Sequence, residues 1–166
     1  MNPSELSSSK IDLHLYWGAY QDLLEAIVTV FRTSCEIPAS LEQVFAAISD
    51  PQRLARWWGP AGFTNTFSVC EFKPGGRWSL VMHGPDGVDY PNENVFAEIE
   101  PPLRVVVDHP SQPVYRLVIS LAPSTGGTSV SWAQTFENSE LASRMKPIVV
   151  PANEQNLARL RAEVLG

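Results

Sequence analysis

Four polar side chains are predicted to lie on the inner face of one antiparallel sheet, and their types could support proton transfer. The alternation of apolar and polar residues turns His109, Tyr115 and Gln134 inward from successive strands, with His109 beside Tyr115. Glu93 follows at the diagonal position on the preceding strand. A carboxylate and an imidazole held close together can exchange protons with a substrate. Glu93 and His109 are therefore weak candidates for an acid–base pair, with Tyr115 as a further acid or base.

Two other interpretations of this polar row stay open. An inward histidine or glutamine near the end of a strand is commonly solvated or bonded to the backbone. A polar group in an otherwise apolar pocket can instead orient a bound ligand. All three interpretations depend on the register of the strands, because one bulged residue turns the positions beyond it to the other face.

No other catalytic or metal-binding arrangement stands out in the sequence. Asp108 and His109 are adjacent, but no serine or cysteine nucleophile with a recognisable turn accompanies them. The three histidines are far apart, and the two cysteines, Cys35 and Cys70, lack CxxC spacing. We expect no metal, no cofactor and no disulfide framework, and the balance favours a protein that is not an enzyme.

Strand and helix signals follow one another in a simple order. Residues 26–37 are rich in β-branched side chains and predict a first strand. A serine–glutamine capping box predicts a helix over 40–49, and an Asp-Pro pair at residue 50 opens a second short helix. Six runs of period-2 alternation, separated by Gly- and Pro-rich turns, fill residues 63–136.

The C-terminal segment is predicted to be helical but contains two prolines. Helical spacing covers 139–146 and 152–165, and Pro147 and Pro151 interrupt it, which predicts a kink. The whole order describes an α+β fold: six to seven antiparallel strands, two short helices after the first strand, and a long C-terminal helix on the concave face of the sheet. Whether a cavity beneath the helix is open depends on that kink.

Residues 1–24 are predicted to be an N-terminal extension of a domain that covers residues 25–166. The first nine residues are polar, whereas Leu13, Leu15 and Trp17 alternate as in a strand. The extension either packs on the domain as an extra strand or pairs with a second copy of the protein, which would give a homodimer.

Composition excludes several classes of partner. The chain has 166 residues, a formal net charge of -6, and only twelve scattered Lys and Arg residues. Binding to nucleic acid or to an anionic membrane surface needs clustered positive charge, so neither is expected. No apolar run approaches the roughly 20 residues of a membrane span, and no secretory signal is visible. The sequence predicts a cytoplasmic protein.

An ordered series of short motifs resembles a known family. The series is DP, WWGP-x-GF, PGGRW, GPDG and EPP, followed by VVPANEQNLARL. It is similar to single-domain bacterial members of the SRPBCC (START-like) superfamily, in the branch named for the activator of the 90-kDa heat-shock-protein ATPase. The resemblance covers residues 26–165. It implies a helix-grip fold, in which the sheet wraps around the C-terminal helix and leaves a cavity between them.

The predicted register and the paired tryptophans give a set of candidate ligand-binding residues. Trp57 and Trp58 are neighbours and cannot share one face of a helix, so one ring is expected inward and the other at the cavity mouth with Phe63. The full set is Trp57, Trp58, Phe63, Trp78, Leu80, Met82, Val95, Val107, His109, Tyr115, Leu117, Trp132 and Gln134.

We expect the cavity to bind a small hydrophobic molecule. Proteins with the helix-grip fold carry lipids, sterols or polyketides, act as cyclases or aromatases, or bind a chaperone, so the resemblance leaves two alternatives. One is a stress-related co-chaperone of the 90-kDa heat-shock protein, although eukaryotic activators use a further domain for that role. The other is a polyketide cyclase-like enzyme that uses Glu93, His109 and Tyr115.

Overall fold

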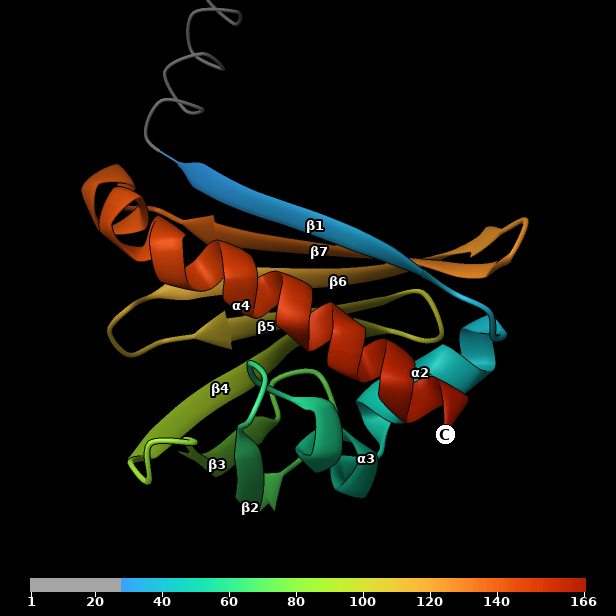
Figure 1. Ribbon diagram of the computed structural model, residues 1–166, viewed down its shortest axis with the longest axis horizontal. Helices are drawn as coiled ribbons and strands as arrows, with labels where there is room; N and C mark the ends of the chain where they lie inside the picture. The colour runs from blue at the N-terminus through green and yellow to red at the C-terminus, as the bar shows by residue number, and fades with distance from the viewer. Residues whose placement is uncertain (1–27) are drawn as a thin grey trace, which may run out of the picture.

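The computed structural model describes residues 28–166, which form a seven-stranded sheet and three helices (Figure 1). In chain order the elements are β1 Thr29–Ile37, α2 Leu41–Ser49, α3 Pro51–Trp57, β2 Thr64–Cys70, β3 Arg77–His83, β4 Asp89–Glu100, β5 Arg104–His109, β6 Tyr115–Ser124, β7 Gly127–Phe136 and α4 Ser139–Leu165. All neighbouring strands are antiparallel. The predicted α+β helix-grip architecture is confirmed. The predicted extension, residues 1–24, lies outside the described residues.

The strand order is β1-β7-β6-β5-β4-β3-β2, so the first strand joins the sheet beside the last one. Figure 1 shows α4 running along one face of the curved sheet, with α2 and α3 beside its C-terminal half. Within residues 28–166 no helix is long and apolar enough to cross a membrane.

The two short helices begin at the predicted caps. Ser40 and Gln43 form the capping box, with each side chain bonded to the other residue's backbone N–H. The Asp50 carboxylate accepts from the backbone N–H of Gln52 at 2.8 Å and Pro51 occupies the first turn of α3. Local sequence chemistry therefore sets where both helices start.

The β6–β7 hairpin pairs in a register two residues away from the expected one. Aligning the inward residues of the two strands across a short turn predicts that Leu117 lies opposite Trp132. This is wrong by two residues, because Leu117 lies opposite Gln134. Both strands continue to a two-residue turn, so that Ser124 lies opposite Gly127. A shift of two residues leaves every side chain on its predicted face, and the inward set of these strands is therefore correct.

In the first half of β4, the side chains that point inward are those predicted to point outward. Glu93 and Val95 were expected to point inward, but Asn94 and Phe96 are the buried residues. The reason is a register shift between Phe96 and Glu98, where one strand carries an extra residue. The bulge turns the positions before it by one, which moves Glu93 to the outer face of the sheet.

Two apolar clusters fill the space between the sheet and the helices. The main cluster is mostly aromatic and branched; it includes Trp57, Trp58, Trp78, Leu80, Phe96, Val107, Leu117, Trp132, Leu157 and Leu160. A smaller cluster of Phe136, Ala142 and Val149 lies under the N-terminal half of α4. The site described below lies where these two clusters meet on α4.

The C-terminal helix is continuous from Ser139 to Leu165, so the predicted interruption at the prolines is wrong. Each proline removes one backbone hydrogen bond and frees the carbonyl four residues earlier. Ser143, Pro147 and Pro151 all lie on the exposed stripe of the helix. Water can hydrate the freed carbonyls of Ser143 and Pro147 there, which is why the helix tolerates both prolines.

Replacing Pro151 by alanine should stabilise the protein. Residue 151 would regain an N–H that can donate to the carbonyl of Pro147, and the ring's clash in the helix interior would disappear. We expect the free energy of unfolding in urea to rise by about 1–3 kcal/mol. Glu154→Ala, also on the exposed face of α4, is the control and should change it by less than about 0.5 kcal/mol. A loss of stability in Pro151→Ala would show that the proline fits a local bend.

Candidate functional site

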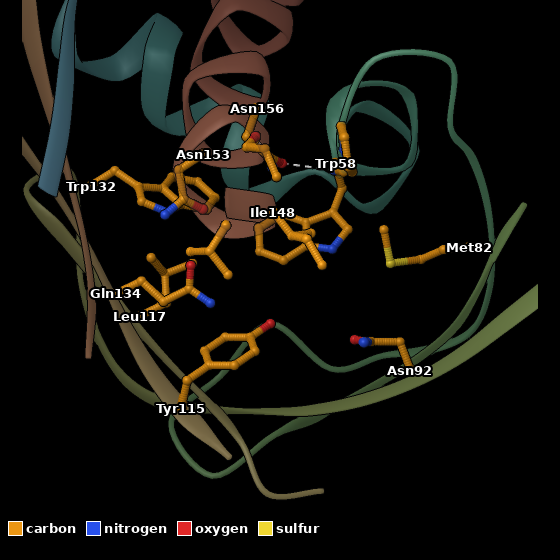
Figure 2. Close-up of a pocket in the computed structure, with 14 residues that line it drawn as sticks. Trp58, Met82, Asn92, Tyr115, Leu117, Trp132, Gln134, Ile148, Asn153 and Asn156 are labelled. Atoms are coloured by element: carbon orange, nitrogen blue, oxygen red, sulfur yellow. Dashed lines mark hydrogen bonds between the residues drawn. The ribbon is translucent and has the colours of Figure 1, made fainter. Parts of the chain in front are cut away.

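A cavity of about 140 Å³ lies between the middle of α4 and the sheet. Its apolar walls come from Trp58, Met82, Leu117, Trp132, Ile148 and Val149. Its polar groups come from Asn92, Tyr115, Gln134, Asn153 and Asn156. Figure 2 shows the Tyr115 hydroxyl and the Asn92 and Gln134 amides directed toward the same space. The lining carries no charged side chain among the described residues.

The structure brings together part of the predicted ligand-binding set. Trp58, Met82, Tyr115, Leu117, Trp132 and Gln134 line the cavity. Trp57, Phe63, Trp78, Leu80, Val95, Val107 and His109 do not. Four of these belong to the main core, namely Trp57, Trp78, Leu80 and Val107. The β4 bulge turns Val95 to the outer face of the sheet. Phe63 packs on Tyr90, with ring centroids 5.9 Å apart. A residue whose side chain is correctly predicted to point inward therefore does not necessarily line the cavity.

The α4 side of the cavity was missed. The buried residues of the second half of this helix are Asn153, Asn156, Leu157 and Leu160, and Val149 is buried just before them. Two asparagines on an otherwise apolar stripe were the available signal, because a buried amide needs a partner and so marks a specific contact. Asn92 was missed for a different reason, since the same bulge that turns Val95 outward brings Asn92 inward.

Trp57 and Trp58 are both buried, because the helix ends between them. Trp57 is the last residue of α3, and its indole N–H donates to the carbonyl of Ala47 at 2.8 Å. Trp58 has extended backbone angles, and its ring packs on Trp78 and Trp132 at centroid distances of 4.6 and 5.6 Å. Trp58 is the ring at the cavity, as predicted for one member of the pair, but Phe63 does not accompany it.

Two side chains of α4 hold the loop after Trp58 in place. The Asn156 amide oxygen accepts from the backbone N–H of Gly59 at 2.7 Å. The Arg159 guanidinium donates to five backbone carbonyls at 2.7–3.1 Å, namely those of Arg56, Trp58, Gly59, Pro60 and Phe63. Burial of this guanidinium lowers the pKa of Arg159 from its usual value. Gly59 has φ +94°, a conformation that favours glycine, and any Cβ there would lie 2.8 Å from Met82 Cε.

Ion pairs add a second link between α3 and α4. The Glu163 carboxylate accepts from Arg53 Nε at 2.9 Å and from an Arg56 guanidinium nitrogen at 2.6 Å. Hydrogen bonding to Arg56, with a further bond to Arg53, holds the pKa of Glu163 below its usual value. The loop that carries Trp58 is thus attached to α4 from both of its ends.

His109 lies behind the cavity wall and orders its neighbours. Its Nδ1 donates to the carbonyls of Ser111 and Pro113, both at 2.9 Å, so Nδ1 carries the proton. Nε2 then accepts from the Asn92 amide at 3.1 Å. The imidazole stacks on the Tyr115 ring with centroids 4.7 Å apart, which confirms the predicted His109–Tyr115 neighbourhood.

The predicted acid–base pair does not form. Glu93 lies on the outer face, where it accepts from the Ser79 hydroxyl, whereas His109 lies on the inner face. Within residues 28–166 no three His, Cys, Asp or Glu side chains cluster in a way that could hold a metal ion. Cys35 and Cys70 are free thiols, and burial raises the pKa of both.

Two buried hydrogen-bond donors at the cavity have no partner in the described part of the chain. They are the indole N–H of Trp132 and the amide nitrogen of Asn153. By contrast, the Asn156 amide is bonded at both ends, since its nitrogen donates to the carbonyl of Ala152 at 2.8 Å. Buried polar groups normally find a partner. The Trp78 indole N–H in the main core also lacks one among residues 28–166, but only Trp132 and Asn153 of these residues combine an unpartnered donor with a place in the cavity lining.

Removing the Arg159 guanidinium should destabilise the fold. Arg159→Met would leave the carbonyls of Arg56, Gly59 and Phe63 without their donor, whereas those of Trp58 and Pro60 keep bonds from Asn65 and Phe63. We expect the free energy of unfolding in urea to fall by about 3–5 kcal/mol. Arg159→Lys keeps the charge but not the fork of donors, so its free energy of unfolding should lie between those of the unmodified protein and Arg159→Met. Arg161→Met should cost less than about 1 kcal/mol, because Arg161 is exposed and makes one bond of 3.3 Å. Equal losses in the two methionine variants would contradict the structural role of Arg159.

The Tyr115 phenol should make stability sensitive to alkali. Burial raises the pKa of Tyr115 above its usual value, so the folded protein holds the neutral form. The stability gained from this is fully present below about pH 10, the pKa of an unfolded tyrosine, and is lost as the pH rises further. Above about pH 10 the free energy of unfolding should fall about 1.4 kcal/mol per pH unit more steeply than in Tyr115→Phe. Parallel slopes in urea titrations of the two proteins would show that this phenol reaches water.

Several solved structures share this fold. A solution structure of a protein from Arthrobacter aurescens has a TM-score of 0.76 and 26% identity, and the match covers 86% of this chain and 88% of that one. A crystal structure from Nitrosomonas europaea has a TM-score of 0.74 and 19% identity, with 82% and 94% covered. The AHSA1-like protein of Aeromonas hydrophila has a TM-score of 0.68 and 21% identity, with 83% and 96% covered.

Sequence comparison agrees with the likeness in fold. No curated protein matches the chain. Residues 38–164, well over half of the chain, match the family model described as Activator of Hsp90 ATPase homolog 1-like protein. The match spans both short helices, strands β2 to β7 and nearly all of α4. This protein therefore belongs to the Activator of Hsp90 ATPase homolog 1-like family and has the helix-grip fold of the SRPBCC superfamily.

Proposed function

We propose that this protein binds a small, largely apolar molecule in the cavity beneath α4. The observation that carries the proposal is the cavity of about 140 Å³ with walls of Trp58, Leu117 and Trp132 and no charged lining among residues 28–166. Ligand pockets typically combine such apolar walls with a few polar groups that orient the ligand. Asn92, Tyr115 and Gln134 supply those groups here.

The size of the cavity limits the part of the ligand that is enclosed. An apolar cavity of roughly 150 Å³ is large enough for benzene, whereas pockets for drug-sized ligands measure about 300–1,000 Å³. The enclosed part is therefore about one ring in size, smaller than the lipids and sterols that the family resemblance suggested. Ile148 lines the cavity and is 64% exposed, so the rest of a longer ligand would extend out of the cavity beside this residue.

The two alternatives have less support. A cyclase-like enzyme needs an acid–base set at the cavity, and the displacement of Glu93 to the outer face removes one member of it. A co-chaperone role rests on the name of the family, and no feature of the described residues favours it. The cytoplasmic location and the homodimer stay predictions from the sequence.

Filling the cavity should weaken ligand binding. We use toluene as the probe, because it has one ring and no polar group, and expect saturable binding by isothermal titration calorimetry. Ala152 lines the cavity from α4, so Ala152→Leu should occupy the space of the ring and weaken binding at least about tenfold. Ala162→Leu makes the same change at an exposed site of the same helix and should leave the dissociation constant within about twofold.

Two results would overturn the proposal. One is the absence of saturable toluene binding to the unmodified protein, which would make the cavity a packing defect. The other is equal weakening in Ala152→Leu and Ala162→Leu, which would place the binding site elsewhere. Native mass spectrometry of gently purified protein adds an independent observation, since a retained small molecule would appear as a fixed mass increment.

A further inference from the structure

We infer that the ligand of this cavity is uncharged and presents a hydrogen-bond acceptor, such as a carbonyl oxygen, to the Trp132 indole and the Asn153 amide. The inference rests on the proposed function and names the chemical class of the ligand. Its basis is the pair of buried donors that the described part of the protein leaves without partners.

The two donors are held away from water and on opposite elements. Trp132 of β7 is 2% exposed and Asn153 of α4 is 5% exposed, and both line the cavity (Figure 2). The same groups are satisfied in Trp57, which donates to Ala47, and in Asn156, which bonds at both ends. The Trp78 indole N–H is also unpartnered within the described residues, but Trp78 does not line the cavity, so no ligand there would meet it. An unmade hydrogen bond of a buried group is unfavourable, so a partner that enters the cavity would be stabilised by meeting it.

The chemistry of the donors defines the partner. An indole N–H can only donate, so the group that meets Trp132 must be an acceptor. A carbonyl oxygen has two lone pairs and can accept from two N–H groups at once. A ketone, amide or ester carbonyl therefore fits the pair, attached to an apolar body of about one ring that contacts Trp58 and Leu117.

Charge selects against acids and amines. No charged side chain lines the cavity among residues 28–166, so an ionised ligand would be buried without a counterion. The Arg159 guanidinium lies close to Gly59, which lines the cavity, but five backbone carbonyls already accept its hydrogen bonds. A carboxylate would be attracted to the two donors but would lose its hydration with no cation to replace it.

Two pairs of probes of matched shape test the inference. Cyclohexanone and methylenecyclohexane differ only in C=O against C=CH₂, and benzamide and benzoate differ mainly in charge. We expect cyclohexanone to bind about fivefold to tenfold more tightly than methylenecyclohexane, and benzamide at least about tenfold more tightly than benzoate. In ¹H–¹⁵N spectra, the indole N–H signal that disappears in Trp132→Phe should move downfield with cyclohexanone and not with methylenecyclohexane.

Variants assign the preference to the two donors. Trp132→Phe keeps an aromatic ring without the N–H, and Asn153→Leu keeps the size without the amide. Each should reduce the cyclohexanone preference by about fivefold, and Asn153→Leu should also raise thermal stability because it removes an unpartnered amide. Trp57→Phe is the matched control: it removes an indole N–H that bonds to Ala47 outside the cavity, and it should leave the preference unchanged.

The outcomes separate this inference from the proposed function. Equal affinity for cyclohexanone and methylenecyclohexane, with toluene still bound, would overturn the carbonyl assignment and leave the binding function in place. Tighter binding of benzoate than of benzamide would overturn the uncharged class. Failure of toluene to bind would overturn both, because the inference rests on the proposed function. If Trp132→Phe does not fold, Asn153→Leu and the indole shift in the unmodified protein still decide the result.

Discussion

Five backbone carbonyls of one loop share a single guanidinium, and the arrangement of the site depends on this contact. The loop turns sharply at Gly59, and within it only the Pro60 carbonyl accepts from a backbone N–H, that of Phe63, so the other carbonyls need a donor from elsewhere. Arg159 of α4 supplies it, and Asn156 one turn earlier fixes the Gly59 N–H. As a result, the helix that covers the sheet also positions Trp58, and the two walls of the cavity are set relative to each other.

Much of the fold could be predicted because its signals are local. The capping box at Ser40, the Asp50 cap and the turn residues between strands act within a few positions of themselves. The inward faces of β6 and β7 were also predictable, since an error of two residues in register does not change the face. Motif order then identified the family, whose sequence model covers residues 38–164.

The site was harder to predict because it depends on long-range contacts. Because of the bulge after Phe96, Asn92 and Asn94 lie on the inner face of the sheet in place of Glu93 and Val95. No turn residue marks this bulge in the sequence. Arg159 meets its partners about 100 residues away, which neither periodicity nor spacing can express. The asparagines of α4 were visible, but only the packed structure shows that Asn156 is satisfied and Asn153 is not.

The place of β1 beside β7 has a consequence for synthesis of the chain. Thr29 lies opposite Phe136, so the first strand of residues 28–166 pairs with the last one. At about 5–20 residues per second, the ribosome needs roughly 5–20 s to make the intervening stretch of about 100 residues. During that interval the apolar residues of β1, such as Phe31 and Ile37, have no sheet neighbour. The nascent chain is therefore prone to aggregation before β7 emerges, and a chaperone that covers apolar segments would act in that window.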